Sequence, residues 1–400
     1  MDGLITQLHP RVLSFYKKSP ITDFASITPA TPLEDLNLNW REKDLPERVR
    51  TKHVHRLHPY LGKFIPQLVE VFLRKYRPKL VYDPFCGSGT TLVEANALGI
   101  NSIGCDISAF NVLLSRVKLY KYDIELLRRE VAGILDKLLK IRRFPLFANS
   151  EGAKIDDTEN EYLRTWFAPQ ARKELLYFKS LIPNYKHQGF LKVVLSRAAR
   201  SARLTTHYDL DFPQRPQTEP YYCRKHGRIC KPVEEAYKFL TRYGIDALNR
   251  VGEFSRIRTD ASTRVIHEDS REVKLPTSID CVITSPPYVG LIDYHEQHKY
   301  AFELLDLPKM EEKEIGKPSR GRDRKAKEEY IREINKVFLH TKKFMTKDAV
   351  VVIVVHDRDN LYNPESVGFK WEGKIDRHVN RRTGMRDTPF FESVLIWRKV

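Results

Sequence analysis

The sequence predicts an α/β protein in which the strands of a mostly parallel sheet alternate with helices. Three stretches lead to this fold class. Residues 81–95 read as a strand, a tight glycine turn and a helix, and residues 102–106 read as a second strand ending in an acid. Residues 278–284 read as a further strand that runs into the sequence Ser-Pro-Pro-Tyr. Strands separated by helical segments are typical of βαβ units, which build parallel sheets.

The first elements can be placed in order along the chain. Residues 1–50 are rich in Pro, Thr and Asn and weakly periodic, so we expect an extended arm that wraps the core. Apolar residues at helical spacing predict an amphipathic helix over 66–76, followed by a strand at 80–82. After the strand at 102–106 we expect a helix over 109–119.

The middle of the chain, residues 123–262, predicts a mainly helical insertion that follows the second strand of the sheet. We expect a long basic helix over 124–141 and two more helices over 161–181 and 189–204. A run of Asn, Ser, Gly and Asp near 149–157 marks a loop between the first two. The insertion therefore separates the second strand from the rest of the sheet.

The sheet is expected to resume after the insertion. Strands are predicted at 263–267 and 278–284, a helix over 330–345, a buried strand at 349–355 and a last strand at 393–399.

The composition indicates a nucleic-acid partner. The 69 Lys and Arg outnumber the 52 Asp and Glu and give a net charge of +17, which favours a polyanion. A length of 400 residues with 41% hydrophobic content suffices for one large α/β domain and a smaller unit. No apolar run approaches the roughly 18–20 residues of a membrane span, and a signal-peptide profile is missing. We expect a soluble cytoplasmic protein that binds nucleic acid and no membrane.

The five cysteines are an odd number. Cys86, Cys105 and Cys281 lie on or beside predicted strands and are interpreted as small buried hydrophobes, not as disulfide partners.

A short stretch in the insertion has the spacing of a metal site. Cys223, His226 and Cys230 could supply three zinc ligands, and His207 is the nearest candidate for the fourth. Because no paired CxxC is present, we expect no metal and interpret the stretch as a basic turn. The basic residues that this turn would carry towards a phosphate backbone are Arg224, Lys225 and Arg228.

Two further basic segments are candidates for nucleic-acid contact. Arg197, Arg200 and Arg203 recur at every third position, which places them on one helix face. We predict that they contact phosphates; the alternative is a solvated helix face. The loop that carries Arg320 and Arg322 is interpreted as a lid that orders on nucleic acid, with simple disorder as the alternative.

The glycine turn predicts a nucleotide site. Glycines at 87 and 89 allow the backbone to approach a ligand closely, and the N–H groups that open the following helix attract anions. The strand at 102–106 ends in Asp106, at the position where Rossmann-like folds hold a ribose diol. The expected ligand is therefore an adenosine derivative.

The sequence Ser285-Pro286-Pro287-Tyr288 has the groups needed to hold an exocyclic amine. The prolines have no N–H and a fixed φ, so they stiffen the turn and leave backbone carbonyls free to accept. The serine hydroxyl is a second acceptor, and the aromatic ring can stack on a base that has left its helix. The alternative is an ordinary strand-to-loop turn, because Pro-Pro is common there.

Together, the stretches 83–91 (DPFCGSGTT) and 284–288 (TSPPY) resemble the S-adenosylmethionine motif and the catalytic motif of exocyclic-amine DNA methyltransferases. Ser-Pro-Pro-Tyr is typical of the N4-cytosine enzymes, whereas adenine enzymes more often have Asp or Asn first. Residues 58–68 resemble the segment that closes over the methionine part of the cofactor. The resemblance covers roughly residues 53–110 and 264–310. It implies a Rossmann-like, seven-stranded, mostly parallel sheet and S-adenosylmethionine as cofactor.

The resemblance also implies roles for single residues. Ser285 and the Pro286 carbonyl would accept the two amine hydrogens, with Pro287 in the same turn, and Tyr288 would stack on the flipped base. Asp269 would accept from the cofactor's adenine amine; the alternative is a helix cap. The implied cofactor-binding residues are Lys63, Phe64, Asp83, Pro84, Phe85, Gly87, Ser88, Gly89, Thr90, Thr91, Asp106 and Asp269.

The expected organisation is an arm (1–50), a methyltransferase domain formed by 51–122 and 263–400, and an insertion (123–262) that recognises nucleic acid. The expected reaction is methylation of the N4 amine of cytosine, in DNA or in a structured RNA such as ribosomal RNA. Two alternatives stay open: an N6-adenine DNA methyltransferase, and a nucleic-acid-binding protein without activity.

Overall fold

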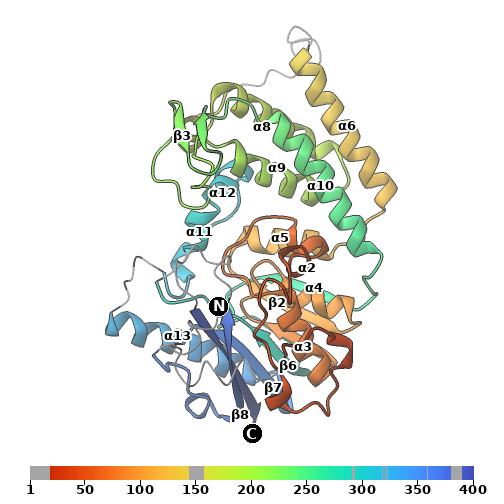
Figure 1. Cartoon of the computed structure of the whole chain (residues 1–400), viewed down its shortest axis with the longest axis vertical. Coiled ribbons are helices and arrows are strands. Elements are labelled where there is room, and N and C mark those ends of the chain that lie inside the picture. The colour runs from red at the N-terminus through yellow and green to blue at the C-terminus, as the bar shows by residue number, and fades with distance from the viewer. Residues whose placement is uncertain are drawn as a thin grey trace, which may run out of the picture.

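A seven-stranded sheet forms the centre of the computed structural model (Figure 1). The structure describes residues 19–143, 157–290, 293–317, 319, 321, 323–357, 359–379 and 390–400. The strands are β1 (Leu80–Asp83), β2 (Asn101–Asp106), β5 (Thr263–His267), β6 (Ile279–Thr284), β7 (Met345–Val355), β8 (Phe369–Val379) and β9 (Phe390–Lys399). Their order is β5-β2-β1-β6-β7-β9-β8, and β9 alone runs antiparallel to its neighbours. The predicted fold class is confirmed.

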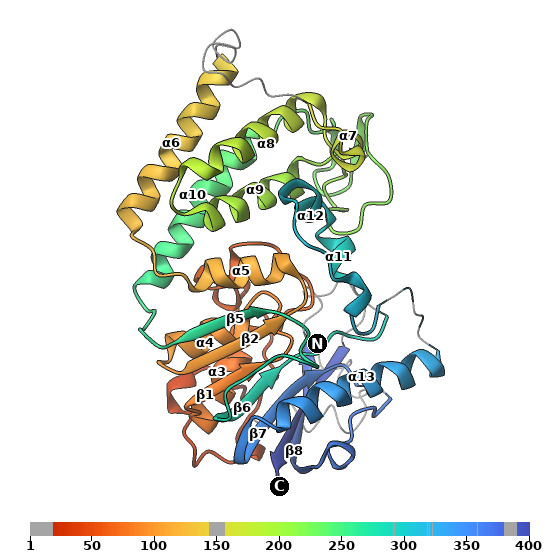
Figure 2. The ribbon, with the colours of Figure 1, turned by 180° about the vertical axis from the view of Figure 1, so that it is seen from behind.

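Helices cover both faces of the sheet because successive strand residues point to opposite sides. Tyr82 and Val282 pack with residues of α13 (Arg324–Lys342) on one face, and Figure 2 shows this helix against the sheet from behind. Val81 and Cys281 pack on the other face with α3 (Pro66–Tyr76). The flanking helices of the first half are α4 (Thr90–Ala97) and α5 (Ala109–Leu119).

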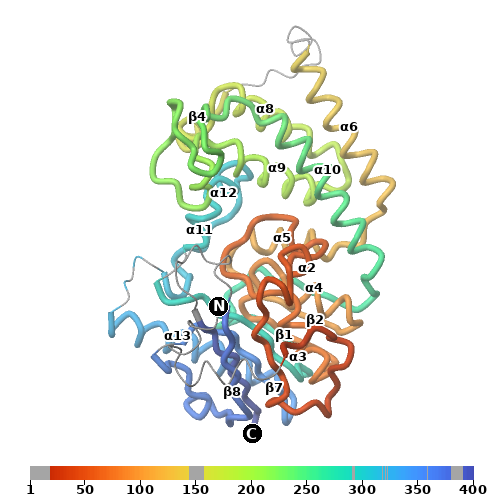
Figure 3. Tube along the Cα trace, in the orientation of Figure 1, coloured from red at the N-terminus to blue at the C-terminus, as the bar shows by residue number. Residues whose placement is uncertain are grey.

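The described part of the N-terminal segment runs across the α3 face of the sheet, as the tube in Figure 3 shows. It contains only short helical turns, η2 (Phe24–Ser26), η3 (Leu33–Asp35) and α2 (Glu47–Arg50), with η4 (His53–Arg56) just after it. Buried apolar side chains fix it to the core, namely Ile27, Leu36, Leu38, Trp40 and Leu45. The described residues of the expected arm, 19–50, thus lie along the core, and residues 1–18 lie outside the described part.

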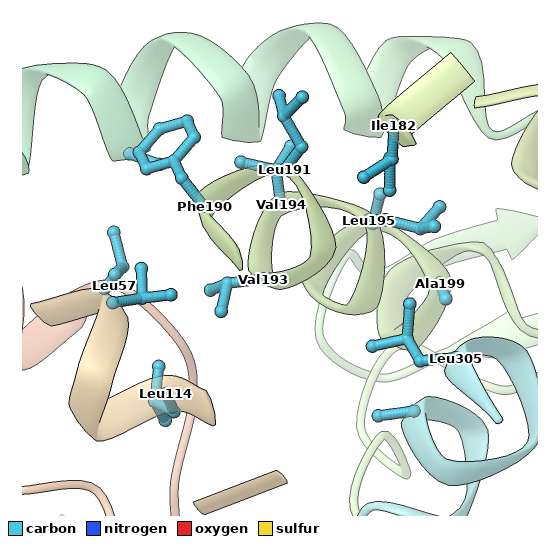
Figure 4. Packing of buried hydrophobic residues seen from close by; sticks show 14 of the residues in the cluster. Leu57, Leu114, Ile182, Phe190, Leu191, Val193, Val194, Leu195, Ala199 and Leu305 are labelled. Carbon is cyan, nitrogen blue, oxygen red and sulfur yellow. The ribbon is translucent and has the colours of Figure 1, made fainter. Parts of the chain in front are cut away.

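The insertion between α5 and β5 forms a helical layer above the sheet (Figure 1). Its helices are α6 (Ile124–Arg143), α7 (Glu161–Trp166), α8 (Pro169–Leu181), α9 (Gln188–Ala202) and α10 (Tyr237–Ser255), with η6 (Ile182–Asn184) after α8 and a hairpin of β3 (Tyr221–Cys223) and β4 (Arg228–Cys230) before α10. In Figure 4, Val193 of α9 lies on the side that faces Leu57 and Leu114, so α9 joins the layer to α5. None of the described helices combines the length and apolarity needed to cross a bilayer.

Some predicted elements are wrong in extent. The single helix expected over 161–181 is two helices, because Pro169 lacks an N–H and starts a new helix at its first position. The helix expected over 330–345 ends earlier, at Lys342, and Met345 already belongs to β7. Elements that the sequence did not predict are α10, the hairpin, β8 and the helices α11 (Tyr294–Gln297) and α12 (Lys299–Leu305), together with the turns η7 (Glu311–Lys313) and η9 (Glu365–Val367).

Candidate active site

The candidate site lies where the carboxyl ends of β1 and β6 meet. From β1 the sheet is extended outwards through β2 and β5, and the chain then returns to β6 on the other side of β1. Ligands of open α/β sheets bind at such a switch point. Asp83 ends β1, Thr284 ends β6, and the Thr284 hydroxyl donates a hydrogen bond to Asp83 Oδ1 at 2.6 Å. The two stretches that the sequence singled out are therefore directly joined.

A pocket opens at this edge of the sheet. The space between its walls, with the open solvent at its mouth included, is about 840 Å³. The predicted cofactor residues that line it are Lys63, Phe64, Asp83, Pro84, Phe85, Gly87, Ser88, Thr90, Asp106 and Asp269. Gly89, the last residue of the loop between β1 and α4, and Thr91, in the first turn of α4, are not among the lining residues of the pocket.

The loop between β1 and α4 needs its glycines. Gly87 has φ +48° and Gly89, the N-cap of α4, has φ +78°, a region that favours glycine. A Cβ on Gly89 would come within 2.7 Å of the Ser115 hydroxyl, and one on Gly87 within 2.8 Å of the Tyr60 hydroxyl. Thr91 Oγ1 donates to the Ile283 carbonyl at 3.2 Å, so the first turn of α4 is tied to β6.

Asp106, at the end of β2, organises the same loop. Its Oδ2 accepts from the Gly87 N–H at 2.8 Å, and its Oδ1 accepts from the Ser108 N–H at 2.8 Å and from Asn111 Nδ2 at 3.1 Å. Burial raises the pKa of Asp106 despite these donors. A carboxylate offers about four lone-pair sites, so acceptor capacity is left for a hydroxyl of a ligand.

Asp83 is almost completely buried, with 1% of its surface exposed. It accepts from Thr284 and, at 3.1 Å, from the Phe85 N–H. Burial raises the pKa of Asp83 to about 6, and the hydrogen bonds from Thr284 and its neighbours oppose this shift. Asp83 is therefore a carboxylate at neutral pH that loses its charge in mild acid.

Asp269 carries an ion pair at the edge of the pocket. Its Oδ1 accepts from the Arg271 N–H and from Arg271 Nε, both at 2.9 Å. Burial opposes ionisation, but the hydrogen bonds from Arg271 outweigh it and lower the pKa of Asp269. Arg271 also pairs with Glu333 of α13. The adenine-accepting role of Asp269 stays a prediction, and Arg271 is the residue that fixes its orientation.

Lys63 and Phe64 border the pocket from the segment before α3. Lys63 Nζ donates to the His55 carbonyl at 2.7 Å, and burial with the nearby charge of Arg56 lowers the pKa of Lys63 to about 8. Phe64 packs into the apolar cluster of the α3 face.

The sequence did not single out several residues of the pocket wall. Tyr60 and Tyr294 stack with ring centroids 5.9 Å apart, and His295 Nδ1 donates to Glu314 at 3.0 Å. Tyr60 lies in the segment 58–68 that resembled the family. Tyr294 and His295 belong to α11, a four-residue helix too short to leave a periodic signal.

Residues 285–288 follow β6, and only some of their side chains face the pocket. Ser285 and Pro287 line the pocket, whereas Pro286 is buried and not among the lining residues. The Tyr288 hydroxyl donates to Glu392 at 3.3 Å, and its ring lies 6.5 Å from that of His356. Burial and the charge of Glu392 raise the pKa of Tyr288. Tyr288 thus lies next to the ends of β7 and β9, beside the pocket and not inside it.

The three arginines of the α9 face require a correction. Arg197 pairs with Asp246 at 2.5 Å and Arg200 with Asp211 at 2.6 Å, while Arg203 is 2% exposed. Their helix face is covered by α10, by the chain after α9 and by α12. The periodicity located the face correctly, but this arrangement leaves its charges no room to contact phosphates.

The other residues predicted to contact nucleic acid are either exposed or outside the described part of the chain. Arg224, Lys225 and Arg228 are exposed on the turn of the β3–β4 hairpin. Arg320 and Arg322 lie outside the described residues.

Comparisons with known proteins point to one family. The sequence profile described as DNA methylase, which joins N6 and N4 methyltransferases, matches residues 33–115. The chain is 38% identical to the Type II methyltransferase M.MjaII of Methanocaldococcus jannaschii over 88% of this chain and 81% of that protein. It is 25% identical to M.MvaI of Kocuria varians (65% and 59%) and 26% identical to M.BsoBI of Geobacillus stearothermophilus (66% and 55%), both also Type II methyltransferases.

Proposed function

Because the chain belongs to the DNA methylase family, whose members use S-adenosylmethionine to methylate exocyclic amines, we propose that its target is the N4 amine of cytosine in DNA. One observation carries this proposal. Ser285 and Pro287 line the same pocket as Asp83 and Asp106. An amine held by Ser285 would therefore lie next to a cofactor held by the two acids.

The pocket fits the cofactor by its donor set. Asp83 suits the ammonium of the methionine part, and Asp106 suits ribose hydroxyls. Two buried polar atoms of lining residues, Ser88 Oγ and Asn111 Oδ1, have no hydrogen-bond partner among the described residues. Buried polar groups are normally paired, so these atoms are available to a polar ligand. The bound cofactor supplies an electrophilic methyl group on a positive sulfonium.

The chain's own residues would prepare the amine. The lone pair of cytosine N4 is delocalised into the ring, so this nitrogen is a weak nucleophile. Ser285 Oγ and the Pro286 carbonyl, as acceptors of its two hydrogens, would concentrate electron density on nitrogen. The cofactor would supply the methyl group, its sulfur leaving as a neutral thioether, and the methylated amine would release one proton to solvent. Positioning the two reactants would supply most of the rate.

Two facts favour cytosine in DNA as the target. The first residue of the catalytic sequence is Ser285, whereas adenine enzymes of this kind more often have Asp or Asn there. The family whose profile matches is described as DNA methylase. Nucleic acid as the partner also agrees with the net charge of +17.

Mass spectrometry of nucleosides tests the proposal directly. The purified chain is incubated with S-adenosylmethionine and either unmethylated DNA or ribosomal RNA, and both polymers are digested to nucleosides. We expect N4-methylcytosine from DNA, formed about 100-fold more slowly or worse by Ser285→Ala. N6-methyladenine would overturn the assignment of the base, and a methylated nucleoside from RNA alone would overturn that of the polymer.

A further inference from the structure

Four side chains of the insertion converge in a way that the proposed methylation does not use. They are His207, which follows α9, and Cys223, His226 and Cys230 of the β3–β4 hairpin. Each offers one nitrogen or sulfur atom, and these four atoms all lie within 4.8 Å of one another. The two cysteines are buried and free of disulfides, while His207 is partly buried and His226 exposed.

The distances between these atoms match a tetrahedral metal site. Cys223 Sγ lies 3.6 Å from His207 Nδ1 and 3.6 Å from His226 Nδ1, and Cys230 Sγ lies 3.4 Å from His226 Nδ1. A tetrahedral Zn²⁺ binds sulfur at about 2.3 Å and nitrogen at about 2.0–2.1 Å, which places such sulfur and nitrogen atoms about 3.6 Å apart. A set of two thiolates and two imidazoles in this geometry selects zinc among common ions.

The hairpin has little apolar packing to hold its shape. Within residues 206–235, Cys223 and Cys230 are the buried side chains, and neither belongs to an apolar cluster of the described core. Tyr222 and Ile229 are instead 59% and 64% exposed. A two-stranded hairpin is marginally stable in water, and small units without a core are usually fixed by metals or disulfides.

We propose that His207, Cys223, His226 and Cys230 bind one Zn²⁺, and that this ion fixes residues 206–235 as an ordered lobe of the insertion. This proposal corrects the expectation of no metal, which rested on the missing CxxC pair. His207 stands 16 residues before Cys223, and the chain folds back to bring the two together.

The surroundings of the site are compatible with a bound ion. The Tyr221 hydroxyl lies 2.8 Å from His207 Nδ1 and also accepts from the His207 N–H at 3.0 Å. Metal binding would replace the first contact and retain the second, which fixes the backbone of His207 beside Tyr221.

The turn of the hairpin shows what the ion would support. The His226 and Gly227 N–H groups both donate to the Cys223 carbonyl, at 3.0 and 2.8 Å, and Gly227 has φ +62°. The site thus closes a tight turn at whose surface Arg224, Lys225 and Arg228 are exposed. The ion would keep these three cations at fixed positions.

The metal content of the purified chain provides the first test. The protein is produced in zinc-supplemented medium and dialysed against metal-free buffer. Its zinc content is then measured by inductively coupled plasma mass spectrometry. We expect about one zinc per chain, and at least a tenfold loss in the double variant Cys223→Ser/Cys230→Ser. Cys281→Ala, which removes a buried thiol from the sheet, is the matched control and should keep its zinc. Zinc absent from the wild-type chain would overturn the proposal, and so would zinc retained by the double variant.

Two measurements on the wild-type chain guard against a variant that fails to fold. Metal-free protein titrated with Co²⁺ should develop the strong visible absorption of a tetrahedral thiolate site, and a weak octahedral spectrum would contradict the geometry. Trypsin cleavage at Arg224, Lys225 and Arg228 should become at least about tenfold faster when a chelator removes the metal, because the lobe then loses its order. An unchanged cleavage rate would overturn the structural role.

Discussion

The pocket at the edge of the sheet and the helical insertion above it place their charged groups by different means. In the pocket, Asp83 and Asp106 end neighbouring parallel strands, so the sheet brings both residues to the same edge. In the insertion, Arg197 and Arg200 are placed by acids from other segments, Asp246 and Asp211. The position of a charged residue at a strand end thus follows from the fold. The position of a charged group on a helix face depends on which residues cover that face.

The same contrast separates two groups of basic residues within the insertion. The arginines of α9 lie in ion pairs or are buried, whereas those of the β3–β4 turn are exposed. Both groups looked alike as clusters of positive charge in the sequence. A basic cluster can therefore contact nucleic acid only where no acid of the same chain has already paired with it.

Ser285→Ala should have the largest effect on catalysis. The change removes an acceptor from the pocket wall while leaving Asp83 and Asp106 in place, so we expect kcat to fall about 100-fold or more, as on losing a preorganised group that polarises the reacting atoms. The affinity for S-adenosylmethionine, measured by calorimetry, should change less than about threefold. An equal loss of cofactor affinity would mean that Ser285 belongs to the cofactor site.

The Arg200–Asp211 pair should matter to stability and not to nucleic-acid binding. Its side chains are 12% and 19% exposed, and breaking a buried pair by removing one partner costs roughly 3–5 kcal/mol. We expect Arg200→Ala and Asp211→Ala each to lower the free energy of unfolding by about 3 kcal/mol. The double variant should lose less than the sum, because each single change leaves an unpaired charge.

The same variants distinguish structure from recognition. If Arg200 contacted phosphates, Arg200→Ala would weaken binding to DNA and Asp211→Ala would strengthen it. We expect neither change to alter the affinity beyond the effect of net charge, measured by fluorescence anisotropy on the folded variants. An opposite response of the two that clearly exceeds the effect of the same change in net charge elsewhere on the surface would restore the original interpretation of the α9 face.

The sheet could be predicted closely because its signals are local. The helices expected over 66–76 and 109–119 and the strand expected at 263–267 have the bounds of α3, α5 and β5. Each combines a clear apolar period with a turn or a motif at its end. The position of the pocket could also be expected from the sequence, because strands that end in Asp83 and Asp106 meet at one edge of a parallel sheet.

The remainder could not be predicted because it depends on contacts between distant residues. Nothing near Arg197 in the sequence indicates that Asp246, which is 49 residues away, will pair with it. The hydrogen bond of Tyr288 joins it to Glu392, which is 104 residues away, and its stacking on a base stays a prediction. β8 escaped prediction because both of its sides are partly polar, with Trp371 47% exposed, so its strand period is weak.

The exposed basic residues of the hairpin turn should have a smaller, electrostatic effect on DNA binding. Removing one cation that neutralises a phosphate lowers the salt dependence of DNA binding, the slope of log K against log salt, by about 0.9. The triple variant of Arg224, Lys225 and Arg228 to alanine should therefore reduce the slope by about 3, without changing the zinc content or the unfolding free energy. The matched control removes the same charge from Lys121, Arg128 and Lys140, which are 72%, 60% and 67% exposed elsewhere. An equal change in the control would show that only net charge matters.

The smallest of the predicted effects is the pH dependence of cofactor affinity, which we attribute to Asp83. Its pKa is raised to about 6, so the carboxyl is mostly ionised at pH 7 and mostly protonated at pH 5. Only the ionised form attracts the ammonium of the cofactor. We therefore expect the Kd for S-adenosylmethionine, measured by calorimetry, to rise roughly tenfold between pH 7 and pH 5.

Asp83→Asn separates this titration from other effects of acid. The variant should bind the cofactor weakly and with little pH dependence over the same range, because the amide has no charge to lose. The unliganded wild-type protein should change in the opposite sense. The pKa of Asp83 is higher in the folded chain than its ordinary value of 3.8, so burying the charge costs stability, and this cost grows as the pH rises from about 4 to about 6. Acid would thus stabilise the empty pocket while weakening its ligand, and a cofactor affinity that falls equally in Asp83→Asn would assign the titration to another group.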